Sequence, residues 1–124
     1  MHILIIEDDE TFRQELAALL RGSLYRVTAP AQLDHIAASL SSIRPDLILL
    51  DLNLPGQSGF EVCTEIRKSS DVPIIFVTGR SDASDEVTAL LKGGDDYITK
   101  PFQPAVLLAH ITAVLKRTGR WKEE

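Results

Sequence analysis

Short apolar runs alternate along this chain with longer segments in which apolar residues recur every three or four positions. The runs at residues 3–6, 47–50 and 73–77 are almost wholly apolar, and weaker runs lie at 25–29 and 95–99. Runs of four or five apolar residues between turn-forming residues predict strands, and uninterrupted runs are typical of strands that are buried on both faces. The pattern therefore predicts five short strands.

Helical spacing predicts five helices between and after these runs, at residues 11–20, 30–43, 58–68, 84–92 and 103–117. Asp9 is the expected N-cap of the first helix, and Ser84 or Asp85 is the expected cap of the fourth. Gly22 ends the first helix, and a glycine pair at 93–94 ends the fourth. The letters LPG at 54–56 predict a turn.

Strands that alternate with helices indicate an α/β fold, because right-handed crossovers place the helices on both faces of a parallel sheet. We predict a doubly wound, flavodoxin-like sheet of five parallel strands in the order 2-1-3-4-5. The length of 124 residues and the 44% hydrophobic content suit one globular domain. We expect this domain to span residues 1–118, with 119–124 as a tail or the start of a linker.

A polar residue stands at the end of four of the predicted strands. Glu7 and Asp8 follow the first, Asp51 the third, Thr78 the fourth and Lys100 the fifth. The carboxyl ends of adjacent parallel strands line one crevice, so these five side chains are expected to meet there.

Three clustered carboxylates repel one another, and a divalent cation between them would relieve that repulsion. Oxygen ligands in an open site favour Mg²⁺, or Mn²⁺ in its place, with Asp8 and Asp51 as direct ligands. One oxygen of Asp51 then remains available to attack phosphorus, while Lys100 supplies a positive charge and Thr78 a hydroxyl donor. The arrangement predicts an aspartyl-phosphate site.

Each of these residues also has an ordinary structural role open to it. An aspartate at this position can cap the first helix, Thr78 can stabilise a turn, Asp51 can accept from loop amides, and Lys100 can extend to water. Taken singly, these roles are the better explanation. Taken together, acidic groups, a lysine and a hydroxyl at the ends of four strands favour a phosphoryl site over these separate structural roles.

Composition and net charge narrow the possible functions and the expected location of the protein. The net charge of −5 argues against nonspecific binding of nucleic acid by this segment. No apolar stretch approaches the roughly 20 residues of a membrane span, so we expect a cytoplasmic protein. Cys63 is the only cysteine and is expected to be a buried or half-buried thiol. The three histidines, at 2, 35 and 110, lack the spacing of metal ligands, and we assign them no catalytic role.

Four segments resemble the receiver domain of bacterial two-component response regulators: IEDD at 6–9, DLILLDLNLPGQSGF at 46–60, VTG at 77–79 and DDYITKPF at 95–102. The resemblance covers nearly the whole chain. It implies that Asp51 accepts a phosphoryl group from the phosphohistidine of a sensor histidine kinase. It also implies that Asp8 binds Mg²⁺ directly, that Glu7 binds it through water, and that Asn53 offers its backbone carbonyl.

The resemblance extends to a conformational switch. Thr78 and Lys100 match the hydroxyl and the amine that contact the phosphoryl group, and Tyr97 matches an aromatic residue that turns inward on activation. Phosphorylation would draw Thr78 inward and alter the surface formed by residues 84–92, 95–99 and 103–117. A cis Lys100–Pro101 bond is usual in the family.

Three further expectations concern the surroundings of the site. Asn53 and Arg80 flank the path of an attacking water, so they are expected to tune hydrolysis of the acyl phosphate. Phe12 either inserts into a partner helix of the kinase or packs into the core of its own domain. Phe102 is a second candidate for partner docking.

The DDYITKPF segment, with LKR at 115–117, resembles the OmpR/PhoB subfamily. Its receivers dimerise through the face described above and are followed by a winged-helix DNA-binding domain, which is not in this chain. Glu86, Val106 and His110 depart from the basic, acidic and arginine residues common on that face, so the usual cross-dimer ion pairs are not all expected. Gly79 and Gly94 stand where alanine is common.

Two other functions compete with the phosphoacceptor. One is a docking or dimerisation module that works without phosphorylation, whose usual mark is the loss of an acid, the threonine or the lysine; all are present here. The other is an aspartate-based phosphatase, but no additional general acid or substrate-binding insertion follows Asp51. We expect catalysis of the domain's own phosphorylation and dephosphorylation, and no turnover of a separate substrate.

Overall fold

A five-stranded parallel sheet forms the centre of the molecule in the computed structural model, which describes residues 1–121. The strand order is β2-β1-β3-β6-β7, and all four neighbouring pairs are parallel. Numbered as successive strands of this sheet, that is the predicted order 2-1-3-4-5. The strands are β1 (His2–Ile6), β2 (Arg26–Thr28), β3 (Leu47–Leu50), β6 (Ile74–Thr78) and β7 (Asp96–Thr99).

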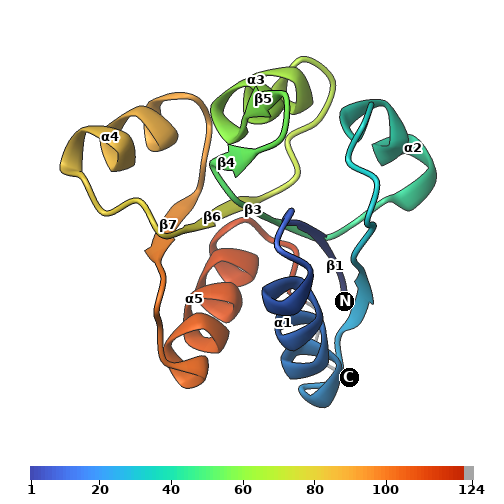
Figure 1. Cartoon of the computed structure of the whole chain (residues 1–124). Helices are drawn as coiled ribbons and strands as arrows, with labels where there is room; N and C mark the ends of the chain where they lie inside the picture. The colour runs from blue at the N-terminus through green and yellow to red at the C-terminus, as the bar shows by residue number, and fades with distance from the viewer. Residues whose placement is uncertain (122–124) are drawn as a thin grey trace.

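Helices cover both faces of the sheet (Figure 1). One face is covered by α1 (Glu10–Gly22) and α5 (Pro104–Arg117). The opposite face is covered by the short α2 (Leu40–Ile43), α3 (Gly59–Arg67) and α4 (Ala83–Leu91). The fold is therefore the doubly wound α/β architecture that the alternating pattern predicts.

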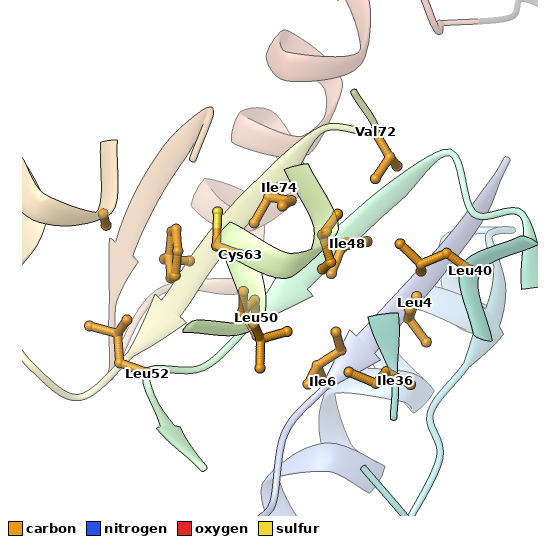
Figure 2. Close-up of a cluster of buried hydrophobic side chains, with 14 of the residues drawn as sticks. Leu4, Ile6, Ile36, Leu40, Ile48, Leu50, Leu52, Cys63, Val72 and Ile74 are labelled. Carbon is orange, nitrogen blue, oxygen red and sulfur yellow. The ribbon is translucent and has the colours of Figure 1, made fainter. Parts of the chain in front are cut away.

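Alternate residues of each strand point into two separate hydrophobic cores, as the period of two along a strand requires. Leu4, Ile48 and Ile74 face α2 and α3, whereas Ile3, Leu49 and Ile75 face α1 and α5. Figure 2 shows the first of these cores, with Cys63 of α3 in place against the strands. Cys63 is fully buried, which confirms the expectation of a small buried thiol.

The caps of the helices agree only partly with expectation. The Asp9 side chain caps α1 by accepting from the Phe12 amide at 3.0 Å, as predicted. Helix α4 begins at Ala83, before both expected caps, because Asp82 occupies the N-cap position. Asp85 instead lies in the first turn, where its carboxylate pairs with Arg80.

The predicted helix at 30–43 is wrong over most of its length. Only a 3₁₀ turn, η1 (Ala37–Ser39), and the single turn of α2 are helical. Leu33, Ile36 and Leu40 are nevertheless buried, as their spacing predicts. The periodicity reports which side chains meet the core, but His35 adopts a left-handed conformation with φ of 57°, which interrupts any regular helix there.

The predicted turn at 54–56 lies in a small antiparallel hairpin that the hydrophobic pattern does not predict. Its strands are β4 (Asn53–Leu54) and β5 (Gln57–Ser58). The hairpin leads directly from the end of β3 into α3, whose N-cap is Ser58. It therefore holds the chain that follows Asp51 close to the end of the sheet.

At the carboxyl end of the described chain, α5 ends at Arg117 and the backbone turns back on the helix. The amides of Arg120 and Trp121 both donate to the Leu115 carbonyl, at 2.8 and 3.0 Å. Residues 122–124, part of the segment expected to be a tail or linker, lie outside the described residues. Between residues 1 and 121, no helix has both the length and the apolarity needed to cross a bilayer.

Candidate phosphoryl-transfer site

The carboxyl ends of β1, β3, β6 and β7 bring the predicted site residues to one edge of the sheet. The amide of Asp51 donates to the Ile6 carbonyl at 3.0 Å, which ties the end of β3 to the end of β1. The amide of Lys100 donates to the Thr78 carbonyl at 2.8 Å, which ties β7 to β6. These ladder bonds bring the ends of four strands together at one crevice.

Lys100 is the centre of charge in this crevice. Its ammonium donates to Glu7 Oε1 at 2.5 Å and to Asp51 Oδ2 at 3.3 Å. The two carboxylates are almost fully buried and Lys100 is about one-fifth exposed, with a relative side-chain exposure of 21%. Ion pairs that are partly removed from water are less screened than surface pairs, so Lys100 compensates much of the local negative charge.

The other oxygen of Asp51 is held by the backbone. Asp51 Oδ1 accepts from the amides of Leu52 at 2.7 Å and Asn53 at 3.3 Å, which leaves Oδ2 facing Lys100. Gly59 permits this turn, since a Cβ at that position would lie 2.2 Å from the Asp51 carbonyl oxygen. The start of α3 thus packs directly against the backbone of Asp51.

Glu7 is held from two sides. Burial raises the pKa of its carboxyl group, an effect opposed by the hydrogen bond from Lys100 and by the bond from the Asp9 amide. Arg13, a buried residue on α1, donates to the Glu7 backbone carbonyl at 3.2 Å. Sequence reasoning overlooked Arg13, because a lone arginine on an amphipathic helix is usually solvent-exposed.

Thr78 and Tyr97 are linked through Arg80. Thr78 is fully buried, and its hydroxyl accepts from the Arg80 amide at 3.4 Å. The Tyr97 hydroxyl donates to the Arg80 carbonyl at 2.6 Å, and burial raises the pKa of this hydroxyl. The Arg80 guanidinium is paired with Asp85 of α4 at 2.9 Å. The loop after β6 therefore connects Thr78, Tyr97 and the start of α4.

The remaining predicted ligands suit a hard cation. Asp8 and Asn53 are exposed; Asp8 follows Glu7 in the chain, and Asn53 lies two residues after the buried Asp51. No group of three acidic, histidine or cysteine side chains within residues 1–121 is arranged to hold a metal ion. Mg²⁺ does not need such a group, because it binds through one or two carboxylates, a carbonyl and waters. The oxygen donors of Asp8, Asp51 and Asn53 fit that requirement.

Phe12 and Phe102 lie together beside this crevice. Their rings meet edge to face, with centroids 6.0 Å apart, and the Lys100–Pro101 peptide bond between the crevice and Phe102 is cis. Both rings are partly buried against the core formed with α1 and α5. They also line an open, mainly apolar groove of about 530 Å³, whose other lining residues are Glu15, Leu16, Leu19, Lys100, Pro101 and Pro104. Phe12 thus contributes to its own core and to an accessible surface.

The face formed by α4, β7 and α5 exposes apolar side chains. Val87 and Leu91 of α4 are 55% and 83% exposed, and Val106 of α5 is 46% exposed. Glu86 is exposed beside them. On the same face His110 Nδ1 and Asp96 Oδ2 lie 2.6 Å apart, so Asp96 has a partner within its own chain.

A doubly wound sheet whose strand ends gather two buried acids, a lysine and a threonine defines a receiver-like α/β domain. The response regulator receiver domain family matches residues 3–112. The chain belongs to this family, and the match confirms the resemblance seen in its sequence motifs.

Individual relatives agree. The chain is 46% identical over 116 residues to the uncharacterized transcriptional regulatory protein YvcP of Bacillus subtilis, covering 94% of this chain and 49% of YvcP. It is 43% identical over 117 residues to the sensory transduction protein RegX3 of Mycobacterium tuberculosis, covering 94% and 52%. The chain therefore spans about half the length of these curated relatives. Its assignment as a response regulator receiver of the OmpR/PhoB type is confirmed.

Solved structures show the same fold. The activated N-terminal receiver domain of Klebsiella pneumoniae RstA superposes with a TM-score of 0.89 at 32% identity, covering 94% of this chain and 99% of that one. The N-terminal domain of the nisin resistance regulator NsrR has a TM-score of 0.83 at 42% identity, covering 92% and 97%. This chain is thus a two-component receiver domain.

Proposed function

We propose that Asp51 accepts a phosphoryl group from the phosphohistidine of a sensor histidine kinase, and that this modification switches the domain between two signalling states. The observation that carries the proposal is the position of Lys100, whose ammonium lies 3.3 Å from Oδ2 of the buried Asp51. A carboxylate with one oxygen held by amides and the other beside a cation is positioned as a nucleophile toward phosphorus.

In the transfer step Asp51 Oδ2 attacks phosphorus and the bond from phosphorus to the histidine nitrogen breaks. The histidine ring, which carries a proton on its other nitrogen, leaves as neutral imidazole with the bonding electron pair. The products are an acyl phosphate on Asp51 and an unmodified histidine on the kinase. Lys100 neutralises charge on the transferred group, and the Thr78 hydroxyl donates to one of its oxygens. The transfer needs no separate general base, because a carboxylate has no proton to lose.

Mg²⁺, or Mn²⁺, would be held by the carboxylates of Asp8 and Asp51 and by the backbone carbonyl of Asn53, with Glu7 acting through water. When bound, the metal neutralises the negative charge that builds up between the carboxylates and the incoming phosphoryl group. Glu7 is suited to an indirect role because its carboxylate already accepts from the Asp9 amide and from Lys100.

The switch would act through the loop after β6. Movement of the Thr78 hydroxyl toward the phosphoryl group would disturb the Arg80 amide that donates to it, and Tyr97 is bonded to the carbonyl of the same Arg80. A shift of this loop would move Asp85 and the start of α4, because the Arg80 guanidinium is paired with that aspartate. Phosphorylation thus favours one arrangement of the α4, β7 and α5 face.

Two residues at the crevice would set the lifetime of the acyl phosphate. The Asn53 amide donates to Asp51, and the Arg80 amide donates to the hydroxyl of Thr78. Replacing both residues is expected to change the rate of autodephosphorylation, and equal rates before and after the exchange would contradict this role.

The groove lined by Phe12 and Phe102 would receive a helix of the kinase, because it is apolar and lies directly beside Lys100. Since this chain spans about half the length of its curated relatives, which include transcriptional regulators, control of transcription is the proposed output. DNA would be bound by a C-terminal domain beyond this segment, because the receiver itself carries a net charge of −5.

Phosphorylation would also promote a homodimer through the α4, β7 and α5 face. Asp96 pairs with His110 in its own chain, while Val87, Leu91 and Val106 are exposed, so this contact relies more on apolar burial than on cross-dimer ion pairs. Leu91→Arg should abolish dimerisation induced by beryllofluoride, measured by sedimentation. Leu24→Arg is the control, because Leu24 is 92% exposed but lies outside that face.

Intact-mass measurement after treatment with Mg²⁺ and a small phosphodonor tests the central proposal. We expect one added phosphoryl group on the wild type and none on Asp51→Asn. Asp71→Asn is a matched control, because the Asp71 side chain is 99% exposed and lies away from the crevice. An unmodified wild type would favour a docking module that works without phosphorylation. A phosphorylated Asp51→Asn variant would contradict Asp51 as the phosphoacceptor.

A further inference from the structure

Phe12 contacts the charged end of Lys100 as well as the hydrophobic core. The Lys100 ammonium lies 4.0 Å from the centroid of the Phe12 ring, within the distance of a cation–π interaction. The ring also meets Phe102 nearly perpendicularly, at an interplanar angle of 82°. Phe12 therefore contacts both a neighbouring aromatic ring and the lysine at the crevice.

The Phe12 ring is a third neighbour of the Lys100 ammonium, in addition to two carboxylates. Glu7 and Asp51 attract Lys100 from the ends of β1 and β3, while Phe12 approaches it from the first turn of α1. A lysine side chain is a flexible four-carbon chain whose ammonium has no fixed donor geometry, so carboxylates alone restrain the position of the ammonium poorly. The face of an aromatic ring attracts a cation without competing for its hydrogen bonds.

We propose that Phe12 is a positioning residue for Lys100, in which the ring face holds the ammonium beside the phosphoacceptor oxygen of Asp51. The same ring lines the apolar groove with Leu16 and Leu19, so a partner that fills this groove contacts the residue that restrains Lys100. The consequence for phosphoryl transfer rests on the proposed function, whereas the restraint on Lys100 does not.

The restraint is measured directly by NMR of the lysine side chains without phosphodonor or metal. Protons above an aromatic ring face are shielded, so the Lys100 ε-methylene signal should lie upfield of the exposed lysines. Phe12→Leu, which keeps an apolar side chain but removes the ring, should abolish this shift. Phe12→Tyr should retain it, because the ring face is kept. Phe60→Leu is the matched aromatic control, since Phe60 lies over Arg80 instead of Lys100.

The functional consequence is measured by the rate of phosphorylation from a small phosphodonor. Phe12→Leu should slow the reaction about fivefold, the change expected from losing a weak cation–π interaction, and Phe12→Tyr should restore the rate. If Phe12→Leu fails to fold, Phe12→Met serves the same comparison. The proposal is overturned if the Lys100 signal is the same in Phe12→Leu as in the wild type. It is also overturned if the wild type is phosphorylated and Phe12→Leu is phosphorylated at the same rate. Absence of phosphorylation in the wild type, with the NMR shift intact, would contradict the proposed function alone.

Discussion

Tyr97 and Arg80, which are 17 residues apart in sequence, are joined by a 2.6 Å hydrogen bond from the tyrosine hydroxyl to the arginine carbonyl. The Tyr97 ring packs in the core beside Phe76, so the bond links the interior of the sheet to the loop after β6. The hydroxyl is protonated at neutral pH and therefore a donor, and burial raises its pKa further above the ordinary value. The loop is thus tied to β7 as well as to Thr78.

Removing this hydroxyl should weaken the fold. Tyr97→Phe keeps the ring but leaves the Arg80 carbonyl without that donor, which should lower the free energy of unfolding by about 1 kcal/mol. Urea unfolding measures the difference. Tyr25→Phe is the control, because Tyr25 is half-buried and its hydroxyl has no hydrogen bond among residues 1–121. Equal losses for the two variants would show that the bond to Arg80 contributes nothing.

Gly94 and Gly79 should respond oppositely to replacement by alanine. A Cβ at Gly94 would lie 2.6 Å from Cε2 of Phe76, whereas one at Gly79 would meet nothing within 4 Å. Gly94→Ala should therefore lower the unfolding free energy by about 1–3 kcal/mol, and Gly79→Ala should be neutral or stabilising.

The Phe76 ring occupies the space in which a Cβ of residue 94 would lie. The stability effects of substitutions at 76 and 94 should therefore not be additive. Phe76→Leu makes room beside Gly94, and Gly94→Ala should cost less stability in that background than in the wild type. A double-mutant cycle by chemical denaturation measures the coupling. Additive losses would mean that the ring moves aside without strain.

Arg67 ties α3 to two loops and should contribute more than a surface arginine. Its guanidinium donates to the carbonyls of Gly93 at 2.7 Å and Val72 at 2.6 Å and pairs with Asp95 at 3.1 Å. Arg67→Ala should cost about 2–3 kcal/mol in unfolding free energy, because several carbonyls lose a charged donor. Arg67→Lys should recover little, since an ammonium cannot reproduce the planar fork.

The neighbouring Lys68 provides the comparison for Arg67. It pairs with Glu65 at 2.7 Å, but the two side chains are 67% and 55% exposed. Lys68→Ala should change the unfolding free energy by about 0.5 kcal/mol or less. Similar losses at Lys68 and Arg67 in urea titrations would contradict the importance of the partly buried Arg67 network.

His2 should make stability depend on pH near neutrality. Its buried imidazole contacts Thr28 at 2.6 Å and Arg26 at 3.3 Å, and its amide donates to Asp46. Burial lowers the pKa of His2 from 6.5; Arg26 and the N-terminal amine lower it further, while Asp46 opposes the shift. The folded protein therefore takes up this proton less readily than the unfolded chain does.

The sign of the effect follows from that difference. The contribution of His2 is fully present above its unfolded pKa of 6.5 and is lost as the pH falls below it toward the lower folded value. His2→Gln should reduce the slope of unfolding free energy against pH just below pH 6.5, where one proton accounts for at most about 1.4 kcal/mol per pH unit. Parallel curves for the two proteins would contradict this prediction.

Local sequence patterns predicted the strands of this fold well, because burial on both faces is the dominant constraint on them. The apolar runs identify the strands, because a strand covered on both faces excludes polar side chains. At residues 30–43 the same signal failed for the backbone: apolar spacing marks burial, and a loop can place Leu33 and Ile36 in the core as a helix would. The cap at Asp82 was missed because Ser84 and Asp85 are equally good capping residues, and Asp85 is engaged by Arg80.

The sequence by itself determined the order of strands and helices and the polar residues at the strand ends, because both follow from short-range periodicity and from the geometry of parallel sheets. Tertiary structure decided which groups actually touch. The placement of Lys100 against Glu7, Asp51 and the Phe12 ring depends on side chains up to 93 residues apart. Likewise, the burial of Arg13 and His2 depends on neighbours from other elements. Local patterns contain no information on such distances, since these contacts form only when the strands pair and the helices pack.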